Sequence, residues 1–256
     1  MIPIILAFIA IGSGLVWYLL HHDHGRRLPP SSLWTAFGFG IAALILAGLL
    51  ETQLFPKSFW VAPQLEPIGL RFLFFMGVGI LEEAAKFVPL ALFIYSRPYF
   101  REHTDGVIYF AICGLTFGLG ENILYTLSFG SKVGIERLVI TPFLHAATTG
   151  IIGYYLASRK IDRKYTAKFI VAAALIPFMH GVYDFGVYSG QDFLLLLSLL
   201  ITLLLTLGLF LYFMQANDLD KAAIARAAAQ TSRFCPRCGR PNMGQKKFCE
   251  FCGQPL

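Results

Sequence analysis

The chain has 256 residues, of which 56% are hydrophobic and 14% are charged, and its formal net charge is +6. A mean hydropathy of +0.64 excludes an ordinary soluble domain and indicates a polytopic membrane protein. The positive charge does not by itself indicate nucleic-acid binding, because Lys and Arg collect in the cytoplasmic loops of membrane proteins.

Seven apolar runs are long enough to cross a bilayer as helices. They cover residues 2–20, 33–50, 68–95, 106–129, 138–157, 167–188 and 193–214. No Lys or Arg precedes the first run, so it lacks the basic start of a cleaved signal peptide, and we expect it to be a retained helix. The sequence therefore predicts an all-α membrane domain of about seven transmembrane helices.

The basic residues between these runs predict the orientation of the chain in the membrane. Eight lie in the loops after the first, third and fifth runs: Arg26, Arg27, Arg97, Arg101, Arg159, Lys160, Arg163 and Lys164. Only Lys57, Lys132 and Arg137 lie in the other loops. Because cytoplasmic loops carry the excess of positive charge, we expect the N-terminus outside the cell and the C-terminus in the cytoplasm.

Four of the five cysteines lie close together at the end of the chain. They form two C-x2-C pairs, each followed by glycine: Cys235, Cys238, Cys249 and Cys252. Four thiolates at this spacing predict a structural Zn²⁺ site, with no open position for a substrate. A segment of this size cannot build a sufficient core, so the metal would supply its folding energy. We divide the chain into a transmembrane domain (1–216), a helical linker (217–232) and a zinc ribbon (233–256).

The third apolar run contains an unusual polar sequence. Glu82, Glu83 and Lys86 lie within five residues at its centre. Three unpaired charges facing lipid would cost on the order of 8 kcal/mol, so they must face other helices, a wet cavity or one another. Lys86 follows one glutamate by four residues and the other by three, so it can neutralise one carboxylate and leave the other free. We expect Glu82 to be the free one; a purely structural ion-pair knot is the alternative.

The next three runs carry further ionisable or polar side chains. Glu121 and Asn122 lie on the fourth, His145 on the fifth, and His180 and Asp184 on the sixth. Counting about 1.5 Å per residue from the expected outer end of each helix places most of them in one layer. Such residues are costly in lipid, which indicates a functional cavity.

Peptide hydrolysis inside a membrane needs a water, a base and donors for the developing oxyanion. Glu82 could activate the water, with Glu83 and Lys86 tuning its charge. A histidine could share the proton, Asn122 or a second histidine could donate to the oxyanion, and Asp184 could orient His180. The set Glu82, Glu121, His145 and His180 would equally suit a divalent metal.

The ordered motifs resemble those of the PrsW family of intramembrane proteases. They are Glu82-Glu83-x-x-Lys86, then Phe117 to Glu121, then His145, then His180 to Asp184. The resemblance implies catalytic roles for Glu82, Glu83, Glu121, His145 and His180, supported by Lys86, Asn122 and Asp184. Prenyl-protein endopeptidases of the same superfamily usually show E-E-x-x-x-R and F-x-x-x-H, so the departure here argues against a prenylated substrate.

The resemblance further implies site-1-like cleavage of membrane-anchored proteins, such as anti-sigma factors, by a glutamic or a metal-assisted mechanism. The expected partners are a membrane-anchored substrate, the lipid bilayer and a cytoplasmic partner of the ribbon, with no nucleic acid. Three alternatives remain open: a proton- or ion-coupled transporter, a haem protein using His145 and His180, and an inactive membrane scaffold.

Overall fold

The fold is all-helical, apart from a small β-ribbon at its C-terminal end. In this computed structural model the described residues are 2–61, 66–231, 233–242 and 247–255. Seven long helices occupy these ranges: α1 (Ile2–His21), α2 (Pro30–Leu54), α4 (Ile68–Phe93), α5 (His103–Phe129), α7 (Ile140–Ile161), α8 (Thr166–Tyr188) and α9 (Asp192–Thr231). Each corresponds to one predicted apolar run. Two short helices that the sequence did not predict, α3 (Lys57–Val61) and α6 (Ser131–Glu136), lie in connecting segments.

The burial pattern of the bundle is the one expected in lipid. Large apolar side chains such as Leu73, Leu92 and Leu196 are exposed on the helix surfaces, whereas Glu83, Lys86 and the two intramembrane histidines are buried. By length and composition, α1, α2, α5, α9 and the segment containing α8 are apolar enough to cross a membrane. The chain is therefore a multi-pass integral membrane protein.

The two remaining long helices, α4 and α7, differ from the rest in the polar residues that they carry. Three charged residues lie in the middle of α4, and α7 carries His145 together with several threonines. These are two of the helices that supply the polar interior. The residues that set these two helices apart from the other spans are therefore the ones that build the site.

Helices α5 and α7 form the most extensive contact in the bundle. Glycines permit this close approach: a Cβ on Gly114 would lie 2.1 Å from the backbone oxygen of His145, and one on Gly106 would lie 2.2 Å from that of Gly153. Real side-chain atoms cannot approach that closely. The backbone of α5 is thus pressed against the turn of α7 that carries His145.

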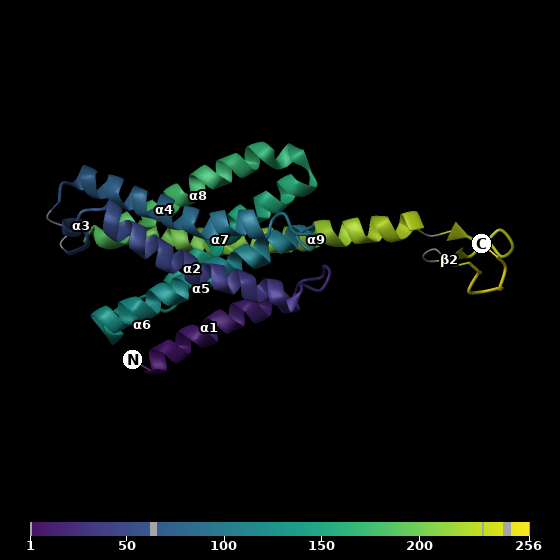
Figure 1. Cartoon of the computed structure of the whole chain (residues 1–256), viewed down its shortest axis with the longest axis horizontal. Helices are drawn as coiled ribbons and strands as arrows, with labels where there is room; N and C mark the ends of the chain where they lie inside the picture. Colours follow the sequence, from purple (N-terminus) through teal and green to yellow (C-terminus); the bar gives the residue numbers. More distant parts are fainter. Residues whose placement is uncertain (1, 62–65, 232, 243–246, 256) are drawn as a thin grey trace.

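Helix α9 extends well beyond the bundle toward the C-terminal ribbon (Figure 1). It is continuous through residues 217–231, so the predicted linker is a prolongation of the last span. The strands β1 (Arg233–Phe234) and β2 (Pro241–Asn242) pair antiparallel. The division into three independent domains stays a prediction.

Candidate functional site

The ion-pair motif of α4 forms the centre of the polar interior. The Lys86 ammonium lies 2.9 Å from Oε1 of Glu83 and 3.3 Å from Oε2 of Glu82, as the i, i+3 and i, i+4 spacings require. Lys86 is fully buried and also lies 4.0 Å from the centre of the Phe117 ring. This one cation therefore serves both carboxylates.

The two adjacent glutamates have different surroundings. Glu83 accepts hydrogen bonds from Thr148 at 2.9 Å and from Thr149 at 3.2 Å, in addition to its contacts with Lys86 and His180. Glu82 instead lines a cavity. Helix rotation thus places Glu83 in the helix interface and leaves Glu82 facing open space.

Each buried histidine uses one ring nitrogen for a carboxylate. His180 Nδ1 lies 2.9 Å from Oε1 of Glu83, and His145 Nε2 lies 2.8 Å from Oε2 of Glu121. Because an ionised carboxylate can only accept, these nitrogens carry the ring protons. In a neutral ring the opposite nitrogen, Nδ1 of His145 or Nε2 of His180, is then the acceptor and can serve as a metal ligand.

Nδ1 of His145 and Nε2 of His180 both lie near Glu82. Oε2 of Glu82 lies 3.9 Å from Nδ1 of His145 and 3.7 Å from Nε2 of His180. All three residues are buried, and the three atoms lie within 4.8 Å of one another. Two imidazoles and one carboxylate are a common ligand set for a catalytic divalent metal. The carboxylates behind both rings match the outer shell that orients metal-bound histidines.

The Lys86 amine competes for the same position. Its nitrogen lies 2.8 Å from Nδ1 of His145, as well as 3.3 Å from Glu82. A bound cation would take over these two acceptors, and the 2.9 Å contact between Lys86 and Glu83 could persist. The residues present thus fit a divalent metal once this amine has moved aside.

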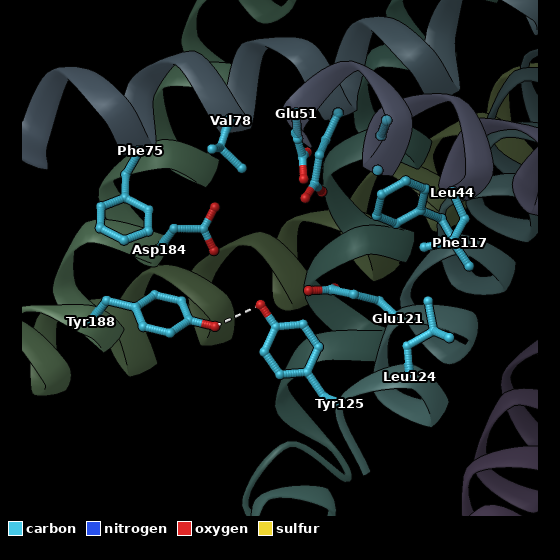
Figure 2. A pocket seen from close by; sticks show the side chains of 13 residues that line it. Leu44, Glu51, Phe75, Val78, Phe117, Glu121, Leu124, Tyr125, Asp184 and Tyr188 are labelled. Atoms are coloured by element: carbon cyan, nitrogen blue, oxygen red, sulfur yellow. Dashed lines mark hydrogen bonds between the residues drawn. The ribbon is translucent and has the colours of Figure 1, made fainter. Parts of the chain in front are cut away.

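A cavity of about 160 Å³ adjoins the group, enough for several waters. Glu51, Glu121 and Asp184 point into it from α2, α5 and α8, among apolar and aromatic side chains (Figure 2). The hydroxyls of Tyr125 and Tyr188 are joined by a 2.8 Å hydrogen bond at its edge. Several carboxylates therefore face one cavity that is large enough to hold water.

Three predicted site residues, Asn122, Asp184 and Glu121, make contacts that differ from those expected from the sequence. Both amide atoms of Asn122 are bonded to Arg137, at 3.0 and 3.1 Å, so this amide is not directed into the cavity. Asp184 Oδ2 lies 3.6 Å from His180 Nε2, which is too long for a hydrogen bond. Glu121 is held by Arg137 at 2.7 Å on one oxygen and by His145 on the other.

Sequence reasoning missed four residues of this region: Glu51, Arg137, Thr148 and Thr149. Glu51 immediately follows the second apolar run as its limits were drawn, and Arg137 was counted as a loop charge. The spacing of Thr148 from His145, one turn of helix, was an available signal. No local pattern pairs Arg137 with Glu121, because a loop separates them.

The C-terminal ribbon forms a second cluster. Its cysteine sulfurs, Cys235 to Cys252 and Cys238 to Cys249, lie 3.5 and 3.7 Å apart. Tetrahedral Zn–S bonds of about 2.3 Å place sulfurs roughly 3.8 Å apart. Gly239 and Gly253 follow the two pairs with φ of 67° and 71°, a left-handed conformation that favours glycine. The four cysteines are therefore arranged as a tetrahedral metal site requires.

An all-helical membrane bundle with a buried Glu/His/His group beside a cavity large enough for water is an architecture suited to hydrolysis within a membrane. Residues 28–214 match the model of the PrsW family, described as intramembrane metalloproteases. The chain belongs to this family and is a peptidase of the PrsW type.

Curated relatives agree with this assignment. The protease PrsW of Geobacillus kaustophilus is 30% identical over 185 residues, which cover 72% of this chain and 79% of the relative. The protease PrsW of Bacillus subtilis is 29% identical over 187 residues, covering 72% and 83%, respectively. No solved structure matches the chain. The ribbon lies beyond the residues matched by the family model.

Proposed function

We propose that this chain hydrolyses a peptide bond of a membrane-anchored protein substrate in the cavity beside Glu82. The observation that carries the proposal is the convergence of Glu82, His145 and His180, with Glu82 also lining a cavity large enough for several waters. Hydrolysis needs a water next to groups that activate it, and the lipid-facing surface alone cannot provide one.

In this proposal Glu82, His145 and His180 would hold a divalent cation, and a cation bound there would supply Lewis-acid chemistry for activating water and polarising a carbonyl. Glu83 and Glu121 orient the two rings through the nitrogens that face away from Glu82. Lys86 holds Glu83 in place. The cavity walls exclude bulk water from the reacting groups.

The glutamic mechanism gives Glu82 a different role, as the base that activates the water with no metal present. The structure offers Lys86 as the counter-ion for that version. The charge balance favours the metal version. Two buried carboxylates, Glu82 and Glu83, and three partly buried ones, Glu51, Glu121 and Asp184, are opposed by the cations Lys86 and Arg137 in this part of the described chain. Unbalanced buried charge is costly, and a divalent cation reduces it.

The orientation and the ribbon complete the proposal. The N-terminus lies outside the cell, and the four-cysteine ribbon binds structural Zn²⁺ in the cytoplasm, where it engages a partner protein. A membrane-anchored regulator, such as an anti-sigma factor, is the expected class of substrate.

Cleavage is tested with purified full-length protein in liposomes that also contain membrane proteins extracted from a bacterial host. New N-termini are identified by mass spectrometry for wild type, for Glu82→Gln and for Glu136→Gln, an exposed control outside the site. We expect termini within or near transmembrane segments from wild type and the control only. Identical termini from all three proteins would refute the proposal.

The same liposomes test the transporter alternative. An entrapped pH-sensitive dye reports proton flux, and the proposed protease should produce none above empty liposomes. Flux that Glu82→Gln abolishes, without any new termini, would favour a proton-coupled transporter instead.

A further inference from the structure

Glu51 is a cavity residue to which neither the motifs nor the proposed metal site assign a role. It lies in the last turn of α2 and lines the same cavity as Glu82. Its carboxylate points toward the space that Glu121 and Asp184 also face (Figure 2). Its Oε1 atom is buried and has no hydrogen-bond partner among the described residues. A buried oxygen without a partner is costly and calls for an explanation.

The other glutamates of the site are held by defined partners. Glu83 contacts Lys86, His180 and two threonines, and Glu121 contacts Arg137 and His145. Glu82 lies between Lys86 and the two histidines. None of these three can exchange a proton without breaking an ion pair or losing a ligand. Proton transfer therefore needs a carboxylate that is less tightly held.

Asp184 is the one other acid of the cavity with a buried, unpartnered oxygen in the described structure. That oxygen, however, lies 3.6 Å from Nε2 of His180, the nitrogen that faces Glu82. Asp184 is thus placed beside the proposed ligand group. Glu51 comes from α2, a helix that contributes none of the three proposed ligands, and it lines the cavity.

We propose that Glu51 is the carboxylate that carries the transferred proton during peptide hydrolysis. This inference rests on the proposed function. The oxygen of water forms a bond to the scissile carbonyl carbon while Glu51 accepts one proton from that water. The carbon–nitrogen bond then breaks, and Glu51 returns the proton to the nitrogen of the leaving amine. The products are a carboxylic acid and an amine, and Glu51 ends as it began.

The test compares Glu51→Gln, Glu51→Ala and the control Glu136→Gln in the liposome assay, on a cleavage site found with wild type. Removal of a proton-transfer group lowers the rate by about 100- to 10,000-fold. We expect this loss for both Glu51 variants, with unchanged membrane insertion. In a background that lacks the ribbon cysteines, each Glu51 variant should retain as much divalent metal as the protein with Glu51 intact. Added formate should restore activity to Glu51→Ala, because it can replace the missing carboxylate, and should not stimulate Glu82→Gln.

Wild-type rates for Glu51→Gln, with Glu82→Gln inactive, would overturn this inference and leave the proposed function intact. Loss of the retained metal in Glu51→Gln would make Glu51 a ligand rather than a proton carrier. Failure of formate to act on a folded Glu51→Ala protein would also contradict the proposal. Absence of any cleavage by wild type would refute the proposed function itself.

Discussion

The adjacent residues Glu82 and Glu83 have different surroundings, because the turn of α4 directs their side chains toward different neighbours. Glu83 is almost fully buried against Lys86, His180 and the threonines of α7, whereas Glu82 faces the cavity. The first resembles a structural ion pair and the second a ligand or base. A single sequence motif therefore places one carboxylate in a helix interface and the other at a cavity.

This difference predicts opposite phenotypes for two equivalent substitutions. Glu83→Gln removes the nearer of the two carboxylates that contact buried Lys86, and with it an ionised acceptor for His180 and two threonines, so we expect a loss of about 3–5 kcal/mol in stability. Glu82→Gln should cost much less stability, because this carboxylate makes only longer contacts. It should also abolish cleavage, because Glu82 is the proposed ligand or base. Thermal unfolding in detergent and the liposome cleavage assay measure the two effects. Equal destabilisation by both substitutions would contradict the division of roles.

At the scale of the helices, glycines set the position of the site. The α-carbon of Gly114 packs against the His145 backbone with no room for a methyl group. Gly114→Ala should force α5 away from α7, cost about 1–3 kcal/mol and lower activity by displacing His145. Gly38→Ala is the matched control, since nothing lies within 4 Å of its added Cβ. Similar unfolding temperatures for the two variants would show that α5 and α7 adapt easily.

The N-terminal end of α5 is held by a residue of α9. The carboxylate of Asp220 accepts the backbone N–H groups of His103 and Thr104 at 3.0 and 2.9 Å, and lies 2.7 Å from the His103 ring. Loss of such a cap costs about 1–2 kcal/mol. Asp220→Ala should therefore lower the unfolding temperature, and Asp218→Ala, exposed on the same helix, should not. An unchanged temperature for Asp220→Ala would mean that other contacts hold this junction.

The sequence predicts the helices of this molecule better than its contacts, for a physical reason. Lipid requires long apolar helices, so all seven long elements could be read from the apolar runs. Lys86 meets both glutamates because helical spacing fixes such pairs. The bond between Glu121 and Arg137 depends on how a loop returns, and the place of Glu51 depends on how α2 packs; neither is encoded in local spacing.

At the scale of the whole molecule, the chain combines a membrane domain that matches the PrsW family with a four-cysteine ribbon beyond it. The continuous helix α9 connects the two, and it also contacts the start of α5, the helix that carries Glu121. Among the residues that the structure describes, two clusters are therefore able to hold a metal, one at the tail and one within the bundle. Any measurement of metal must distinguish them.

The most direct test is the metal content of a variant in which Cys235, Cys238, Cys249 and Cys252 are all serine. We expect this protein to retain about one equivalent of divalent metal and to cleave its substrate. His180→Ala in the same background should lose both the metal and the activity. A four-serine variant that cleaves normally and holds no metal would contradict the metal site and assign the chemistry to the glutamates alone.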